Sequence, residues 1–254
     1  MNFATPVVAR LGLIVVALLV WEIAGHTVFD PSFISPPSAI ARALPSLLGD
    51  SKIVGAILVS LYELVVAFVV CVIAGIAIGA AVGLHRFTLR AALPLILLAY
   101  SIPQVTILPL FILYFGIGVE SKIAFGVSHG IFPIILNVIA GVQTVESVHI
   151  AAARSMGATR VQIFRRVVVP HMVPSLFTGL RLGMAATLLG VLLAELYVSS
   201  SGIGYYTQLF SNSFNPPAMF ALVAVLALMA VFLNEVVRRA EVRASFWRAQ
   251  GHAP

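Results

Sequence analysis

One short run in this sequence has the spacing of a hydrolase nucleophile. Residues 126–130 read Gly-Val-Ser-His-Gly, which matches the pattern G-x-S-x-G. That pattern needs a strand–turn–helix context and partner acids, and here it lies in a long apolar stretch with no acid nearby. The same residues form G-x-x-x-G, a spacing that lets two membrane helices pack closely. We interpret the run as a packing face, with an intramembrane hydrolase as an open alternative.

Three ionisable residues lie inside apolar stretches, where a charge is costly and is by default a functional hypothesis. Glu63 is expected near the outer membrane interface. Arg181 is expected at a cytoplasmic helix end, from which its long side chain can reach the interface. Glu195 is expected either to line a transport pathway or to accept hydrogen bonds from loop backbone.

Proline breaks mark a second region with polar character. In the run Ser101–Pro109, Pro103 and Pro109 remove backbone donors and free the carbonyls of the preceding turn. Such backbone is tolerated in a membrane where it is buried in protein or lines water. We therefore predict a translocation pathway at Pro103, Gln104, Thr106, Pro109 and Glu195, and a simple helix kink is the alternative.

Other chemistry is missing from the sequence. The only lysines are Lys52 and Lys122, and neither follows a G-x-x-x-x-G run, so no P-loop for ATP is expected. No cluster of His, Cys, Asp or Glu has the spacing of metal ligands, and the single cysteine, Cys71, excludes an intrachain disulfide. The sequence predicts a non-catalytic chain that binds no cofactor or metal itself.

The composition also argues against a soluble enzyme. Of 254 residues, 61% are hydrophobic and only 9% are charged, whereas about a quarter of a soluble domain is charged. This excludes a soluble enzyme, a disordered chain and a nucleic-acid binder, and it makes lipid the main solvent. We predict a single all-α polytopic domain, residues 1–254, with about six transmembrane helices. The predicted helices cover residues 9–28, 58–84, 94–115 (interrupted), 122–143, 175–198 and 217–237.

Small residues repeat along two of these helices and predict close helix packing. They are Gly75, Gly79 and Gly83 in the first of the two, and Gly179 and Gly183 in the second. Between the spans, residues 39–48 are expected to form a short outer helix capped by Ser38. The uncharged run 199–216 is expected to be a re-entrant or interfacial loop.

Basic residues predict the orientation. With six spans and a cytoplasmic N-terminus, the inside holds Arg10, Arg86, Arg90, Arg154, Arg160, Arg165, Arg166, Arg238, Arg239, Arg243 and Arg248. The outside holds Arg42, Lys52 and Lys122. Because short cytoplasmic loops are rich in Lys and Arg, both termini are expected in the cytoplasm.

The cytoplasmic loop, residues 146–172, has the pattern of a docking surface. Gly157 is expected to end one short helix, and Thr159 to cap a second that runs to about Val168, before Pro170 and Pro174 end the segment. The apolar side chains of this second helix exceed what a free loop exposes, which indicates a protein partner. They are Val161, Ile163, Phe164 and Val167, flanked by Arg160, Arg165 and Arg166. A helix lying on the lipid surface is the alternative.

This loop resembles the EAA loop of ABC importer permeases, in which E-A-A is followed by three residues and a glycine. Ala151-Ala152-Ala153 precede Arg154-Ser155-Met156 and Gly157, and Val169-Pro170 stand at the far end. Ala151 replaces the family's glutamate. The resemblance extends to the nitrate, sulfonate, taurine and bicarbonate branch through "FISPPSAI" (33–40) and through residues 101–123 and 179–206.

The resemblance implies a type I importer permease in a bacterial cytoplasmic (inner) membrane. Two permease copies would pair, two cytoplasmic ATPases would supply ATP and Mg²⁺, and a periplasmic or lipid-anchored binding protein would deliver a small anion. Gly157 to Val168 would be the coupling helix, with Phe164 inserted into the ATPase. The coupling residues by resemblance are Ala151, Ala152, Gly157, Ala158, Arg160, Phe164, Arg165 and Pro170. The alternatives are an importer for a pyrimidine or aromatic acid, and an ion- or proton-coupled secondary transporter.

Overall fold

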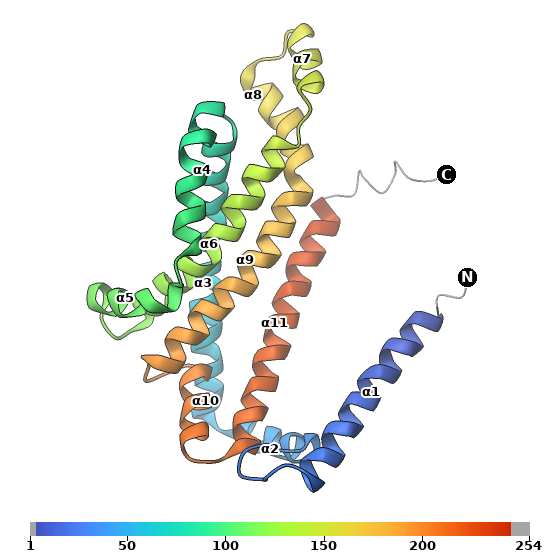
Figure 1. Ribbon diagram of the computed structural model, residues 1–254, viewed down its shortest axis with the longest axis vertical. Coiled ribbons are helices and arrows are strands. Elements are labelled where there is room, and N and C mark those ends of the chain that lie inside the picture. The colour runs from blue at the N-terminus through green and yellow to red at the C-terminus, as the bar shows by residue number, and fades with distance from the viewer. Residues whose placement is uncertain (1–3, 245–254) are drawn as a thin grey trace. The chain divides into compact units, whose positions relative to one another are not determined.

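The computed structural model describes residues 4–244, and every regular element in that range is a helix (Figure 1). The predicted all-α fold is therefore confirmed. Arg248, counted above among the inside arginines, lies outside the described residues. The chain divides into two compact units, which we describe separately. Unit 1 holds residues up to Val59 and Ser199–Leu228, and unit 2 holds Ser60–Val198 and the residues from Met229.

Unit 1 is built from α1 (Ala4–Thr27), α2 (Pro37–Gly49), α10 (Ile203–Asn212) and the adjoining turns of α3 and α11. The helix predicted over 39–48 is present as α2, but Ser38 does not cap it. The N-cap position is Pro36, because Pro37 already has the backbone angle φ that the first helical residue needs. Instead, the Ser38 backbone N–H donates to Glu22 Oε2 of α1 at 2.9 Å.

The run 199–216 is more ordered than the loop we expected. It contains α10, which is preceded by Gly202 at φ +102° and followed by a turn in which Phe214 has φ +52°. The Phe214 ring makes an edge-on contact with Phe33, with 6.2 Å between the ring centres. Turns at both ends of α10 thus let a short helix form where the composition indicated an irregular loop.

Unit 2 is organised around α6 (Val119–Gln143) and α9 (Val169–Tyr197), which run side by side (Figure 1). The later part of α3 (Ser51–Gly83) and the end of α11 (Pro216–Ala244) belong to the same unit. A Cβ atom on Gly75 of α3 would lie 2.7 Å from Ile134 of α6, and one on Gly183 of α9 would lie 2.6 Å from the same side chain. The glycines therefore let α3 and α9 approach the buried Ile134 from two sides.

The other repeated glycines of α3 and α9 have similar surroundings. A Cβ atom on Gly79 would lie 2.7 Å from Val138, one on Gly83 3.2 Å from Val142, and one on Gly179 2.7 Å from Asn137. The packing interpretation of residues 126–130 is also confirmed, because a Cβ atom on Gly130 would lie 1.8 Å from Thr187 Oγ1. Ser128 lies within α6 and donates to the Phe125 carbonyl at 2.7 Å, so the strand–turn–helix context of a nucleophile is not present there.

The third predicted helix is two helices joined at a sharp bend. The chain forms α4 (Arg86–Ser101), a 3₁₀ turn η1 (Gln104–Ile107) and α5 (Leu108–Phe115), with a bend of 81° between α4 and the segment Gln104–Phe115. Pro103 causes the break, because it offers no backbone N–H and forces Ile102 into an extended conformation. Pro94 lies inside α4, so our predicted start at residue 94 was wrong.

The candidate spans can be compared with the six helices that we expected. Among the described residues, four helices are long and apolar enough to cross a membrane, or five if the bent pair is one span. They are Ser51–Gly83, Val119–Gln143, Arg160–Tyr197 and Pro216–Ala244. The first predicted span falls on α1, whose apolar stretch, Leu11–Thr27, is shorter.

The helix of unit 2 that we expected over 175–198 begins earlier. We predicted that Pro170 and Pro174 would end the preceding segment, but α8 (Arg160–Ile163) continues through a π-helical turn, η2 (Phe164–Val168), directly into α9. A proline ring normally clashes with the carbonyl four residues earlier, and a π turn inserts one extra residue and relieves that crowding. Helix continues from Arg160 to Tyr197 as a result.

Candidate functional site

The first candidate surface lies at one end of unit 2, where α7 (Ser147–Ser155) and α8 follow α6 (Figure 1). Gly157 separates the two helices at φ +77°, a left-handed conformation that favours glycine. Thr159 caps α8 as predicted: Thr159 Oγ1 accepts from the Gln162 N–H at 3.3 Å, and Gln162 Oε1 accepts from the Thr159 N–H at 2.8 Å. This reciprocal box orients α8 relative to the glycine turn.

The predicted coupling residues differ in exposure. Ala151, Ala152, Gly157, Arg160 and Arg165 are exposed, whereas Ala158, Phe164 and Pro170 are half-buried. Phe164 packs against the core cluster that includes Val168 and Met172.

The apolar face of this segment is not the one we expected. Ile163, which we placed on the docking face, is buried at 8% exposure, because it points from α8 toward the body of unit 2. The exposed apolar side chains are Met156 at 81% and Val161 at 65%. Sequence reasoning missed Met156, although its position directly before the left-handed Gly157 places it at the tip of the turn. We call Met156, Gly157 and Val161 the tip surface.

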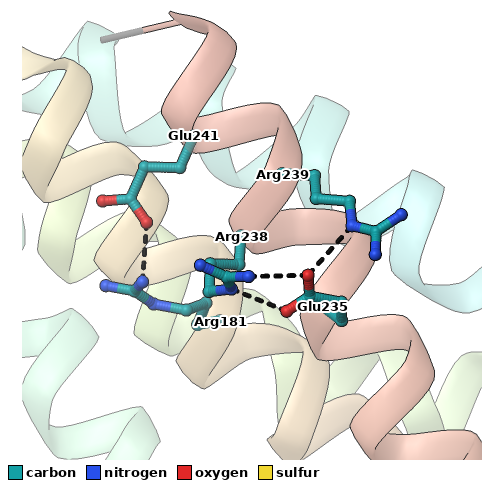
Figure 2. Close-up of polar contacts among 5 residues, drawn as sticks. All are labelled: Arg181, Glu235, Arg238, Arg239 and Glu241. Atoms are coloured by element: carbon teal, nitrogen blue, oxygen red, sulfur yellow. Dashed lines mark hydrogen bonds and ion pairs between the residues drawn. The ribbon is translucent and has the colours of Figure 1, made fainter. Parts of the chain in front are cut away.

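One ion pair connects α9 to α11 in the same unit, and further ion pairs lie within α11 (Figure 2). Arg181 Nη1 donates to Glu241 Oε2 at 2.6 Å, with about a third of the Arg181 side chain exposed. Glu235 accepts from Arg238 at 2.6 and 2.7 Å and from Arg239 at 2.9 Å (Figure 2). Arg181 thus has a partner within the protein, and the access of its side chain to the membrane interface stays a prediction.

Beside Arg181 lies a groove of about 440 Å³ between α9 and α11. Its polar members are Arg181 and Asn234, and its walls are apolar. The wall residues are Leu64, Leu182, Met184, Ala185, Leu188, Ala230, Val231 and Leu233. None of the predicted pathway residues lines this groove.

The predicted pathway residues around the bend lie mostly at the surface of unit 2. Pro103, Thr106 and Pro109 are exposed, and Gln104 is half-buried. Thr106 Oγ1 donates to the carbonyl of Pro103 at 2.7 Å, so it satisfies a group that the proline break frees. The Gln104 side-chain oxygen is buried with no hydrogen-bond partner among the described residues.

The fifth pathway residue, Glu195, lies in a buried charged cluster that the sequence did not predict. Ser60 Oγ of α3 donates to Glu195 Oε1 of α9 at 2.5 Å, and Lys122 of α6 forms an ion pair with Glu63 of α3. All four side chains are buried, with exposures between 0% and 2%. We call Ser60, Glu63, Lys122 and Glu195 the buried cluster.

The burial of two of these residues was not expected. We expected Glu63 near the outer interface and Lys122 on the outside; their depth in the membrane stays a prediction, and both side chains are enclosed by helices. The charge pattern alone misled us, because Lys122 lies within the first turns of α6 and was counted as a loop residue. The available signal was that Lys122 is followed by an apolar helix and therefore needs a carboxylate partner.

The structure brings only part of the predicted pathway together. A hollow of about 300 Å³ contains Pro109 along with Val105, Leu108, Ile112, Tyr197 and Val198, but not Gln104, Thr106 or Glu195. Glu195 is linked to this region through its neighbour Ala194, which packs with Leu108 and Phe125.

Comparison with known proteins assigns the fold and the family. Residues 71–241 match the family model described as binding-protein-dependent transport system inner membrane component. The chain is similar in fold to a permease chain of an inward-facing methionine ABC transporter, with a TM-score of 0.61 and 19% identity, covering 72% of this chain and 94% of that one.

Relatives with known names cover nearly the whole chain. The taurine transport system permease of Escherichia coli (strain K12) is 32% identical over 96% of this chain and 91% of its own length. A formylaminopyrimidine transport permease of Halalkalibacterium halodurans is 26% identical, over 91% and 92%. A putative aliphatic sulfonates transport permease of Bacillus subtilis is 26% identical, over 92% and 85%. The chain therefore belongs to the family of binding-protein-dependent transport system inner membrane components, the multi-pass permease subunits of ABC importers.

Proposed function

We propose that this permease moves a small organic sulfonate or a related anion across a bacterial cytoplasmic membrane, driven by an ATPase on separate chains. The tip surface is the observation that supports a permease chain and a separate ATPase chain. An exposed methionine and valine flank a left-handed glycine on a capped two-helix projection. Such a surface fits an apolar pocket on a cytoplasmic protein better than it fits water.

The continuity of helix from Arg160 to Tyr197 supports a mechanical role. The α8 turn is the first part of this helix, so a partner that displaces α8 also displaces α9. Since α9 packs along the length of α6, the displacement would reach the far end of unit 2. Movement of rigid helices between two packed arrangements is how a solute site is opened to alternate sides.

The partners follow from this mechanism. Two ATPase copies would bind ATP and Mg²⁺ and dock on the tip surfaces of two permease copies, and a separate binding protein would deliver the solute. The inside-facing arginines favour both termini in the cytoplasm. The chain itself would bind no nucleotide and carry out no covalent chemistry.

The substrate class is proposed from the relatives. The taurine and aliphatic sulfonate permeases both handle small sulfonates by name, and they match nearly the whole chain. A pyrimidine is the second candidate, because the formylaminopyrimidine permease covers the chain almost equally well. The predicted pathway residues Gln104, Thr106, Pro103, Pro109 and Glu195 remain our candidates for contact with the solute.

Substitution of the tip surface tests the proposal. We expect Val161→Asp and Met156→Asp to insert normally but to lower recovery of the ATPase in co-purification about tenfold or more, because a carboxylate must then enter an apolar pocket. Ile117→Asp is the matched control, because Ile117 is also an exposed apolar residue (72%) but lies in the connection at the opposite end of α6. Equal recovery of the ATPase with all three variants would contradict the docking proposal.

A further inference from the structure

The buried cluster contains one predicted pathway residue, Glu195, but the predicted pathway gives no role to Ser60, Glu63 or Lys122. Its carboxylates and its ammonium are almost completely withdrawn from solvent, with 0% exposure for Glu63 and Glu195 and 2% for Lys122. A buried ion pair is seldom more stable than well-packed apolar side chains of similar volume. In a membrane-spanning chain, ionisable groups at such positions are rare and generally have a function.

The cluster has a defined place in the fold. Ser60 and Glu63 lie one helical turn apart on α3, Lys122 lies near the beginning of α6, and Glu195 lies near the end of α9. The hydrogen bond from Ser60 joins α3 to α9, and the ion pair of Glu63 with Lys122 joins α3 to α6. The buried cluster therefore ties three helices together at the end of unit 2 that is opposite α7 and α8.

The bent segment rests directly beside these ties. Leu108 of α5 is buried at 5% exposure against Phe125 of α6 and Ala194 of α9. Phe125 lies one turn after Lys122, and Ala194 precedes Glu195. The Phe111 ring of α5 also contacts Phe125 edge-on, with 5.5 Å between the ring centres. The surface under α5 is thus made by residues adjacent to the buried cluster.

We propose that Glu63, Lys122 and Glu195 are positioning residues that set the register of α3, α6 and α9 and thereby hold a fixed surface under the bent segment 102–115. Ionic and hydrogen-bonded groups act at one register only, because a shift of one helical position leaves a charge without its partner. An apolar interface tolerates such a shift. The inference rests on the proposed function, since it gives the bent segment a role in solute passage.

The test separates register from stability. Three variants are reconstituted with the ATPase in sealed lipid vesicles, so that transport, ATP hydrolysis and melting can all be measured. They are Lys122→Met, the exchanged pair Glu63→Lys with Lys122→Glu, and the uncharged triple variant Glu63→Met, Lys122→Met and Glu195→Gln. We expect Lys122→Met to lower both the melting temperature and transport, because the buried Glu63 carboxylate loses the cation that pairs with it. The exchanged pair should recover most of both.

The triple variant is the decisive case. We expect it to melt at or above the wild-type temperature but to transport about tenfold or more slowly while ATP hydrolysis continues, because small misplacements of working groups have large effects on rate. Wild-type transport by the triple variant would overturn the proposal. An exchanged pair that melts like the wild type but transports no better than Lys122→Met would also overturn it.

Ser60→Ala keeps the test usable if the charge variants fail to fold. It removes only the hydroxyl that donates to Glu195. We expect a melting temperature close to wild type and transport reduced about threefold relative to ATP hydrolysis. An unchanged ratio of transport to hydrolysis would contradict the positioning role of Glu195.

A labelling experiment does not depend on transport. In a Cys71→Ala background, which removes the only native cysteine, Leu108→Cys places a thiol under α5. We expect N-ethylmaleimide to label it about tenfold faster in the triple variant, because the surface under α5 has lost its register. Equal labelling rates would overturn the inference. If the wild-type complex carries no solute, the proposed function fails, but this labelling still decides the positioning role.

Discussion

Two sites in unit 2 pair the same kinds of charged side chains in different surroundings. Arg181 and Glu241 form an ion pair whose side chains are 36% and 22% exposed, and they lie on α9 and α11 (Figure 2). Glu63 and Lys122 form an ion pair whose side chains are 0% and 2% exposed, and they lie on α3 and α6. The difference in exposure changes what each pair can contribute.

An exposed ion pair loses little hydration and gains little attraction when it forms, because water and ions can replace either partner. Such pairs stabilise proteins by about 0–1 kcal/mol. A buried pair gains a strong mutual attraction but has lost its hydration, so the loss of one partner leaves an uncompensated charge. The comparison teaches that the pair of Arg181 and Glu241 is replaceable, whereas the buried cluster requires all its members together.

The largest expected effect is at the buried site. Glu63→Gln removes the carboxylate that pairs with Lys122, and we expect a loss of about 3–5 kcal/mol in the free energy of unfolding. The measurement is thermal unfolding of purified protein in detergent. Glu241→Gln is the matched control, because it makes the same change at a half-exposed pair. Equal melting temperatures for the two variants would remove the distinction between the sites.

The next largest effect is expected at the half-exposed pair of Arg181 and Glu241, where Arg181 is now replaced. Arg181→Met keeps the apolar stem in the groove but removes the charge, and we expect a stability change of about 0–1 kcal/mol. Lys122→Met, measured in the same detergent, provides the contrast. A loss with Arg181→Met as large as that with Lys122→Met would show that Arg181 is not accessible to water.

The smallest expected effect is a response to salt. Raising the ionic strength from about 0.1 M to about 1 M shortens the screening length from about 10 Å to about 3 Å. We expect the stability difference between wild type and Arg181→Met to shrink with added salt, because that pair is solvent-accessible. The difference between wild type and Glu63→Gln should stay constant. A salt-dependent difference for Glu63→Gln together with a constant difference for Arg181→Met would contradict the burial that we assign to the two pairs.

Local features of the fold were predictable from the sequence. The break at Pro103, the left-handed Gly157 and the cap at Thr159 were expected from residue type, because each depends on a few neighbouring backbone atoms. Features that depend on distant residues were not. Ile163 was expected on the docking face and is buried, and Pro170 was expected to end a helix that instead continues through a π turn.

The candidate sites divide in the same way. The projection at 147–163 could be located from the spacing of Gly157 and Thr159, although its exposed Met156 was missed. The buried cluster could not, because Ser60 and Glu195 are 135 positions apart along the chain. Nothing near Lys122 in the sequence identifies Glu63 as its partner.

By itself, the sequence determined that this protein is helical and lipid-embedded, which side chains cap or break its helices, and which family it belongs to. Those properties follow from composition, periodicity and local backbone chemistry, all of which are written in consecutive residues. Only the tertiary structure decided which charges are buried, which partners they have and which apolar residues stay exposed. Burial is a property of neighbours brought from elsewhere in the chain, and the energy of a charge depends on it more than on residue type.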